Sequence, residues 1–293
     1  MAPALNLSCG GVRIDGAIDL HCHFGPEPLI ARAVGSAHSV DPFDAAHDAA
    51  DAGMGAIVLK GHEFPTGLLA HLVQQQVPDV RVFGAICCDA HVGGLNPAAV
   101  EVALNSGAVF VWLPTISAAE NNPFLRRVGG AGLRTIDEDG RLLPEVLEIM
   151  RLVAEHDAVL ATGHISATEH VAVAREFGRR GNLVVTHAMQ QVAGPGLTVA
   201  ECVELAEFGA TIEFSAHSCM GLPAVFGEVI AALGKLPPRQ VVLSTDYGWT
   251  TGSPRPAPGF GSYLDALWEA GVGESLLAGF ARDNPARLLG LAG

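Results

Sequence analysis

The sequence contains no long hydrophobic run, although 49% of its 293 residues are hydrophobic and its mean hydropathy is +0.33. Its apolar residues come in short runs, whereas a membrane-spanning helix needs about 20 in succession. The first residues, MAPALNLSCGGVR, lack a basic segment followed by an apolar one, so no secretory signal is expected. Short apolar runs of this kind are typical of parallel strands that are buried on both faces.

Basic residues are scarce, with 17 Lys and Arg against 31 Asp and Glu, which gives a formal net charge of −14. Binding to nucleic acid requires a basic face that displaces counterions from phosphates. Nucleic acid and acidic membrane surfaces are therefore not expected as partners. A small-molecule substrate is expected, and a homo-oligomer is left open.

Several familiar motifs are also absent. The six cysteines, at positions 9, 22, 87, 88, 202 and 219, form no C-x-x-C pair and no disulfide framework, so a reduced, cytoplasmic protein is expected. The chain has no G-x-S-x-G nucleophile elbow, no P-loop and no G-x-G-x-x-G after a strand. Serine-nucleophile, P-loop nucleotide and dinucleotide chemistry are therefore not indicated.

Eight short apolar runs with turn residues before them predict strands. They are Ile18–Leu20, Ala56–Leu59, Val80–Cys87, Val109–Leu113, Ala158–Thr162, Leu183–Thr186, Ala210–Phe214 and Val241–Thr245. Segments with helical periodicity lie between them. They are Phe43–Ala52, Leu68–Gln76, Pro97–Asn105, Pro144–His156, Glu169–Arg179, Val199–Phe208 and Ala224–Leu233, and residues 276–291 follow as a final helix. This alternation predicts an α/β fold, a (β/α)8 TIM barrel, with residues 1–293 as one domain.

Two longer connections are predicted to leave the catalytic end of this barrel. One is an insertion at about residues 115–143, in which Asp139-Gly140 could close a hairpin between Arg134 and Leu142. The other is the Gly- and Pro-rich loop Tyr247–Gly261. Each is either a lid over a substrate or surface filler. Their arginines, which either bind a carboxylate or are solvated, are Arg126, Arg127, Arg134 and Arg255.

Histidines collect at the ends of the predicted strands. Of the twelve in the chain, seven follow an apolar run within a few residues, and Asp246 holds the same place after the eighth run. The seven are His21, His23, His62, His91, His164, His187 and His217. Imidazoles and a carboxylate at the carboxyl ends of barrel strands are what a catalytic metal centre requires.

The first of these positions carries the most specific motif, His21-Cys22-His23. Because side chains alternate along a strand, residues two apart point the same way and can hold one ion together. Cys22 is then expected to point outward and to pack rather than to bind metal.

This constellation resembles the amidohydrolase superfamily of metal-dependent hydrolases, which are (β/α)8 barrels. Its members carry H-x-H after strand 1, a His after strand 5, a His after strand 6 and an Asp after strand 8. The corresponding residues are His21 and His23, His164 in ATGHIS, His187 in VVTHAM and Asp246 in LSTDYG. The resemblance covers nearly the whole chain and includes the closing helix Asn284–Leu291. The segments VLKGHEFPT and VGGLNPAAVE look like a little-characterised branch of the superfamily.

The resemblance implies a divalent metal centre with one or two ions, Zn²⁺ or alternatively Mn²⁺. His21, His23, His164 and Asp246 would hold an ion, and His187 would bind a second ion or polarise a substrate carbonyl. Asp246 would accept a proton from the attacking water and pass it to the leaving group. The implied reaction is hydrolysis of an amide, cyclic amide, lactone or ester.

The chain departs from the superfamily pattern at strand 4, where binuclear members often supply a carboxylated lysine. Strand 4 reads VFVWLPT, and the only lysine at a strand end is Lys60, after strand 2. Lys60 could be a carboxylated metal ligand, a cation that holds an anionic substrate, a catalytic base, or a packing residue. His62, His91 and His217 could contact the substrate, although a loop histidine is often only hydrogen-bonded packing.

Two further functions stay open. A strand 4 without lysine favours a single metal, which is the arrangement in decarboxylases and hydratases of this superfamily. The alternative outside enzymes is a catalytically silent barrel that binds metal or ligand.

Overall fold

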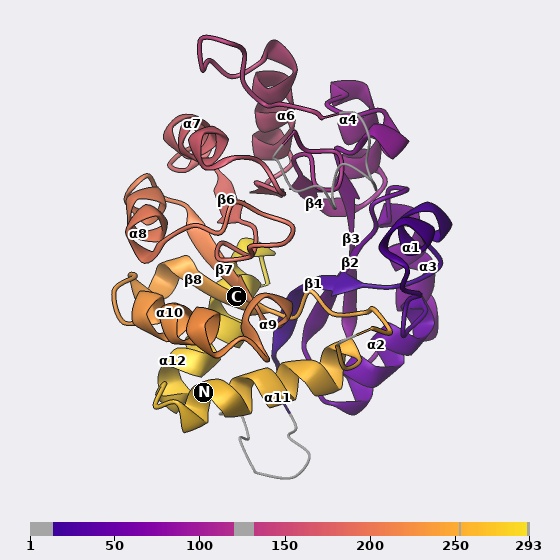
Figure 1. Cartoon of the computed structure of the whole chain (residues 1–293). Coiled ribbons are helices and arrows are strands. Elements are labelled where there is room, and N and C mark those ends of the chain that lie inside the picture. Colours follow the sequence, from indigo (N-terminus) through magenta and orange to yellow (C-terminus); the bar gives the residue numbers. More distant parts are fainter. Residues whose placement is uncertain (1–13, 120–131, 252, 292–293) are drawn as a thin grey trace.

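The computed structural model describes residues 14–119, 132–251 and 253–291 (Figure 1). Eight parallel strands follow one another around a barrel in sequence order, β1 to β8, with the helices outside them. The strands are β1 Ile18–His23, β2 Ala56–Lys60, β3 Arg81–Cys87, β4 Ala108–Trp112, β5 Val159–Ala161, β6 Asn182–Val185, β7 Thr211–Ser215 and β8 Val241–Ser244. The predicted (β/α)8 barrel is confirmed.

The helices surround the barrel, and none among the described residues combines the length and apolar content that crossing a membrane demands. They are α1 Pro28–Val34, α2 Pro42–Asp51, α3 Gly67–Gln76, α4 Pro97–Asn105, α6 Pro144–Glu155, α7 Ala167–Phe177, α8 Val199–Glu207, α9 Ala216–Cys219, α10 Pro223–Leu233, α11 Pro256–Glu269, α12 Glu274–Ala278 and α13 Asn284–Leu288. Short 3-10 turns lie at η1 Ala90–Val92 and η2 Pro238–Gln240, and the π-helical turn η3 Gly279–Asp283 joins α12 to α13.

Local signals explain where several helices begin. Capping boxes, in which Ser or Thr at the N-cap and Glu three residues later satisfy each other's backbone N–H, start α7 at Ser166 and α8 at Thr198. Asp41 and Asn96 cap α2 and α4 in the same way through their side-chain oxygens, and a proline follows each of them. These signals fix where α2, α4, α7 and α8 begin.

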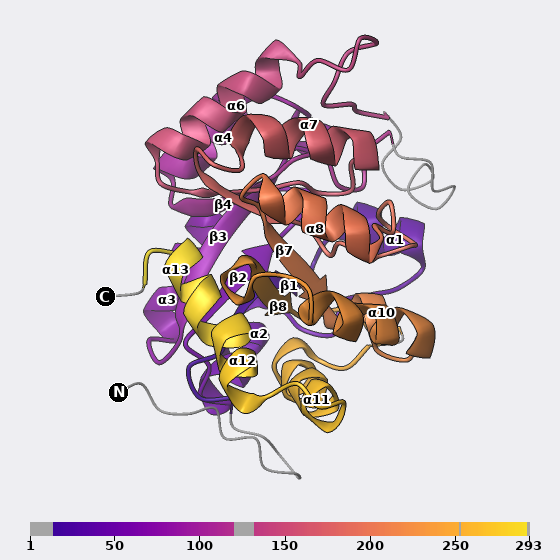
Figure 2. The ribbon, with the colours of Figure 1, turned by 90° about the vertical axis from the view of Figure 1, so that its left-hand side faces the viewer.

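The core has two layers. Alternate strand residues, such as Val58, Phe110 and Trp112, form an inner cluster, which Leu288 of α13 joins at one end. The other strand residues pack with the helices in a larger outer cluster. Figure 2 shows α13 at one end of the barrel and α1 at the other. The end away from α13 is the one at which the strands terminate, so it is available for a site.

A bulge in β1 decides which of its side chains face inward. Ile18 and Leu20 belong to the inner cluster, whereas Cys22 packs in the outer one, and the register of β1 against β2 shifts between these positions. The inward-facing set therefore changes from even to odd residues along the strand. This change turns His21 and His23 toward the interior, and Cys22 outward as expected.

The barrel closes next to these histidines. The backbone N–H of His23 donates to the carbonyl of Tyr247 at 2.8 Å, and that of Asp246 donates to the carbonyl of His21 at 2.9 Å. The bonds that join the last strand to the first therefore also set Asp246 beside the two histidines.

The loop predicted at Tyr247–Gly261 is partly wrong, because α11 begins at Pro256 and includes both Gly259 and Gly261. A Cβ atom on Gly259 would lie 2.4 Å from the ring of Tyr247, so the glycine permits close packing of the helix on the barrel. Tertiary contact outweighs the low helix propensity of this segment. The short helices α1 and α9 were also not predicted.

The insertion after β4 forms the predicted hairpin, with an antiparallel bridge between Ile136 and Leu142. Arg126 and Arg127 lie outside the described residues. The predicted final helix begins slightly earlier, at Glu274, and passes through η3 before it ends.

Gly84 of β3 offers a stability test of the packing beside the site. A Cβ atom there would lie 2.4 Å from the Cα of Gly67, a backbone atom that cannot move away cheaply. We expect Gly84→Ala to lower the free energy of unfolding by about 1–3 kcal/mol, as overpacking usually does. The matched control is Gly227→Ala in α10, where a Cβ meets nothing within 4 Å, and it should be neutral or stabilising. Equal effects of the two variants in urea unfolding would contradict this view of the contact.

Candidate metal centre and active-site cavity

Three ligand-type side chains converge where β1 and β8 end. The Nε2 atoms of His21 and His23 each lie 3.0 Å from Oδ1 of Asp246. The three side chains are buried, and their potential ligand atoms all lie within 4.8 Å of one another. This donor set, two imidazoles and a carboxylate, suits a divalent cation.

Glu213 on β7 stands behind this group, and sequence reasoning missed it. Its Oε1 lies 3.1 Å from Nδ1 of His21 and accepts a hydrogen bond from Ser244 at 2.7 Å. Burial opposes ionisation, but His21 and His187 outweigh it and hold the pKa of Glu213 below its usual value. The carboxylate therefore accepts the Nδ1 proton of His21, and Nε2 would become free to bind a metal once the ring loses its second proton. The signal in the sequence was a glutamate within the apolar run ATIEF.

The charge distribution of the group is strongly coupled. Burial and Lys60 act to lower the pKa of His21, but Asp246 and Glu213 raise it to about 9. Burial acts to raise the pKa of Asp246, yet its histidine neighbours hold it well below the ordinary value. Asp246 is therefore an anion, and without a metal its charge is balanced by protonated His21, because burial holds the pKa of His23 well below its usual value.

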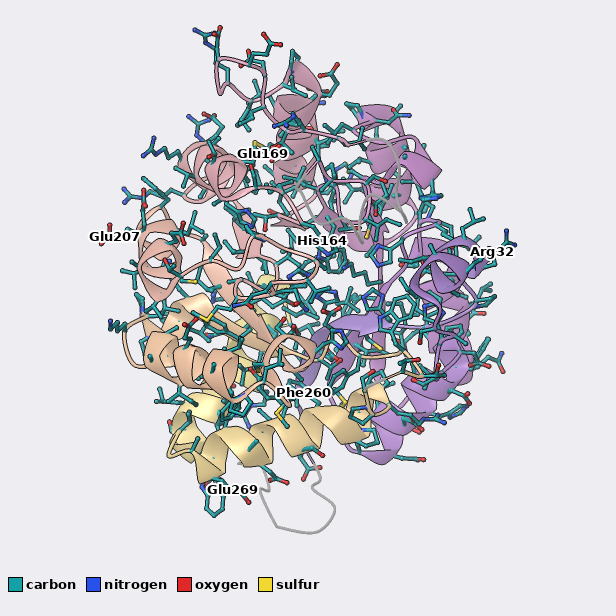
Figure 3. All side chains as sticks on the ribbon, viewed as in Figure 1. Arg32, His164, Glu169, Glu207, Phe260 and Glu269 are labelled. Atoms are coloured by element: carbon teal, nitrogen blue, oxygen red, sulfur yellow. The ribbon has the colours of Figure 1, made fainter. Side chains whose placement is uncertain are left out.

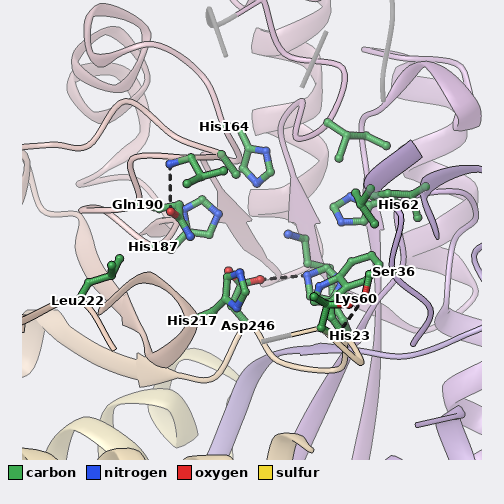
Figure 4. Close-up of a pocket in the computed structure, with 17 residues that line it drawn as sticks. His23, Ser36, Lys60, His62, His164, His187, Gln190, His217, Leu222 and Asp246 are labelled. Atoms are coloured by element: carbon green, nitrogen blue, oxygen red, sulfur yellow. Dashed lines mark hydrogen bonds and ion pairs between the residues drawn. The ribbon is translucent and has the colours of Figure 1, made fainter. Parts of the chain in front are cut away.

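His164 and His187 face the same space from β5 and β6 (Figure 4). Their ring centroids are 4.8 Å apart, and both are buried. Burial lowers the pKa of His187 to about 4 and that of His164 well below its usual value. The Nδ1 atom of each ring has no hydrogen-bond partner within the described part of the chain. Neutral, unsatisfied imidazoles are the form in which histidine binds a metal.

The backbone is strained at two of these positions. Asp246 has φ 56° and His187 has φ 26°, values that non-glycine residues rarely adopt. The N–H of His187 donates to Glu213 Oε2 at 2.7 Å, which holds this conformation. Strain retained at a site of this kind is a mark of function rather than of packing.

Lys60 lies at the floor of the site, 1% exposed. Its Nζ is 2.8 Å from Nε2 of His21 and 5.2 Å from the ring of Trp112. Trp112 itself is buried in the inner core. The amine of Lys60 thus occupies the lone-pair side of His21, the side on which a metal would bind.

His62 is held by a short relay. Its Nδ1 donates to Thr115 Oγ1 at 2.8 Å, and that hydroxyl donates to the buried carboxylate of Asp89. Burial opposes ionisation of Asp89, but bonds from His62, Thr115 and Ser117 lower its pKa. The relay leaves Nε2 of His62 as an acceptor, and the ring stacks on His23 at 5.0 Å. Asp89 was also missed by the sequence analysis, although it follows strand 3 directly.

These groups share a cavity of about 310 Å³. Its polar floor carries His23, Lys60, His164, His187 and Asp246, with His62 beside them (Figure 4). The remaining wall is lined by Ile30, Val34, Ser36, Ile116, Gln190, Val192, Ala193, His217, Leu222, Trp249 and Thr251. Figure 3 shows His164 at the centre of the ring of helices, whereas Arg32, Glu207 and Glu269 lie at its rim. The volume is that of a small-molecule site.

The two other predicted substrate contacts, His217 and His91, lie in different surroundings. His217 lies on α9 and lines the cavity mouth, with its ring 6.1 Å from that of Tyr247. His91 lies on η1, is exposed and does not line the cavity, so the structure does not support a substrate contact there. The chain turns away from the barrel axis after Asp89, which carries His91 to the surface. Arg255 pairs with Asp48 at 2.6 Å on the outside.

Comparison with known proteins gives no match among curated proteins. Among solved structures, the chain is similar to a probable dipeptidase from Pseudomonas aeruginosa (11% identity, TM-score 0.65, 95% of each chain covered). It is also similar to an amidohydrolase from Pseudomonas aeruginosa (12%, TM-score 0.61, 94% of this chain and 96% of that one). A third is 2,6-dihydroxybenzoate decarboxylase (15%, TM-score 0.61, 94% and 100%). These likenesses confirm the resemblance to amidohydrolases at the level of the fold.

A protein-family model described as a family of unknown function, DUF6282, matches residues 16–213, which is more than half of the chain. The matched range runs from the start of the barrel through β6 and ends at Glu213. It therefore contains both residues of the H-x-H motif, Lys60, and the histidines after β5 and β6, whereas Asp246 lies beyond it. The chain belongs to the DUF6282 family of unknown function.

Proposed function

We propose that this chain is a metal-dependent hydrolase that cleaves an amide, cyclic amide, lactone or ester bond of a small molecule. The observation that carries the proposal is the convergence of His21, His23 and Asp246 on one point, with Glu213 behind His21. The solved structures with the same fold include a probable dipeptidase and an amidohydrolase, which supports this reaction class.

The residues fit a divalent ion. Zinc–ligand bonds of 2.0–2.1 Å in a tetrahedral site separate neighbouring ligand atoms by about 3.3 Å. The observed separations of 3.0 Å from His21 and His23 to Asp246 need only a few tenths of an ångström of adjustment. We assign these three residues and His164 to a Zn²⁺ ion, with Mn²⁺ as the alternative. His187 either contacts the substrate carbonyl or takes part in binding a second ion.

The bound ion would supply Lewis acidity and lower the pKa of a water molecule. Asp246, ionised in the protein, accepts a proton from the attacking water and transfers it to the leaving group. A ring N–H of His187 would donate to the carbonyl oxygen as negative charge develops there. The buried floor excludes bulk water, which strengthens each of these interactions.

Metal analysis of the purified protein tests the proposal. We expect about one equivalent of a divalent transition metal or more, and loss of turnover of lactones, esters or cyclic amides after chelation. Activity should return when Zn²⁺ or Mn²⁺ is added back. Less than about a tenth of an equivalent, with no activity gained on adding either ion, would rule the proposal out.

Glu213→Gln should weaken metal binding without removing a ligand. The amide cannot hold the proton of His21 on Nδ1 as a carboxylate does, so affinity should fall by about 10–100-fold. Competition with a chelator measures this change. Glu207→Gln, an exposed position on α8, is the matched control. Equal affinity in the two variants would show that Glu213 has only a packing role.

A mononuclear decarboxylase or hydratase is the second candidate. β4 supplies no lysine, the compact group holds three ligands, and 2,6-dihydroxybenzoate decarboxylase shares the fold. Release of CO₂ from an aromatic acid, without incorporation of labelled water, would favour this reaction. A protein that keeps its metal but turns over none of these substrates, nor phosphoesters, would be a silent binding barrel.

A further inference from the structure

The cavity wall above the polar floor contains an apolar cluster that belongs to neither core of the barrel. Ile30 and Ile116 are 3% and 4% exposed and pack with Val34, Ala193 and Trp249. These residues come from three strand-end connections and from α1. The cluster is separate from both barrel cores. All five of its residues line the cavity.

Two exposed apolar side chains also line the cavity. Val192 and Leu222 line the same cavity and are 54% and 51% exposed. At the inner end, Trp249 lies 5.2 Å from His23, ring centroid to ring centroid. An apolar strip therefore runs from the reacting groups to solvent. Exposed apolar surface that rims a polar pocket is typical of a binding site.

The charges of the residues that line the cavity also favour an apolar ligand. Among the described residues that line the cavity, Lys60 is the only lysine or arginine, and it lies at the floor against His21. Apart from His217 at the mouth, the wall's polar members are the neutral residues Ser36, Gln190 and Thr251. The net charge of −14 also repels anions on approach. A charged group placed along the wall would lose its hydration without a partner.

From these observations we propose that the substrate carries an uncharged apolar group, an alkyl chain or a plain aromatic ring, next to the bond that is cleaved. This inference rests on the proposed function, because it takes the polar floor as the reacting end. The apolar group would lie along Ile30, Trp249 and Val192, and its burial would supply binding free energy in proportion to its area.

Hydroxamic acids of increasing chain length test this specificity, because they bind a divalent ion without being turned over. Binding of acetohydroxamic, butanohydroxamic and hexanohydroxamic acid to the Zn²⁺-loaded protein is measured by calorimetry. We expect the dissociation constant to fall about threefold to fourfold for each added methylene. Adipic monohydroxamic acid, which has the same chain length with a carboxylate at its end, should bind at least about tenfold more weakly than hexanohydroxamic acid.

Substitutions at the mouth test whether the dependence of binding on chain length comes from this wall. Val192→Ser with Leu222→Ser should weaken hexanohydroxamic acid and leave acetohydroxamic acid unchanged. Val102→Ser on α4, 66% exposed, is the matched control and should change neither. Tight binding with no dependence on chain length, or a preference for the carboxylate, would overturn the apolar substrate alone. Absence of binding by every hydroxamate in a protein that takes up no metal would overturn the proposed function and this inference with it.

Discussion

Asp246→Asn is expected to lower turnover by at least about 10³-fold, because one residue supplies both a metal ligand and the proton acceptor. An amide can neither carry the charge that balances protonated His21 nor accept the proton of the attacking water. The side chain is nearly isosteric, so its bonds to both rings can persist and the fold should be retained.

Three measurements make this result specific. Metal content should fall, the far-UV circular dichroism should be unchanged, and the loss should appear in kcat more than in KM. Asp79→Asn, at an exposed position before β3, is the matched control and should behave as wild type. Full activity of Asp246→Asn would remove Asp246 from the mechanism and require another proton acceptor.

Lys60→Ala is expected to lower turnover by at least about 10²-fold, the scale usual for an acid–base group. The amine lies 2.8 Å from Nε2 of His21, where an ammonium and a divalent cation would repel each other strongly. Metal binding therefore requires Lys60 to swing away, to lose its charge, or to become a carbamate that is itself a ligand.

Metal content and KM separate these roles. If Lys60 is a carbamate, Lys60→Ala should lose metal, short carboxylic acids should partly restore it, and ¹³CO₂ should give the wild type a carbamate NMR signal. If Lys60 is a cation, metal content should hold while KM for an anionic substrate rises. Lys235 is the only other lysine of the chain and is exposed, so Lys235→Ala is the matched control. An unchanged Lys60→Ala enzyme would leave the lysine a packing residue.

The prediction from sequence succeeded where a local pattern decides the structure. Short apolar runs alternating with periodic segments predicted every strand of the barrel, because strands buried on both faces need continuous apolar residues. Because His164, His187 and Asp246 follow strand ends, the sequence also predicted that they lie at the same end of the barrel. It failed at Pro256–Glu269, where glycine and proline indicate a loop but packing against Tyr247 supports a helix. It also offered His91 as a substrate contact, whereas His91 is exposed and does not line the cavity. The position of a strand end does not determine the direction of the turn that follows it.

What the sequence by itself determined is the barrel and most of the polar residues that lie where its strands end, since both follow from spacing along a chain of parallel strands. Only the tertiary structure decided how those residues meet. A bulge in β1 turns His21 and His23 inward, Glu213 reaches His21 from a strand 192 residues away, and Lys60 lies against His21 Nε2. These contacts join strands that are distant in the chain. Their geometry depends on register, twist and closure of the whole barrel, which no local segment specifies.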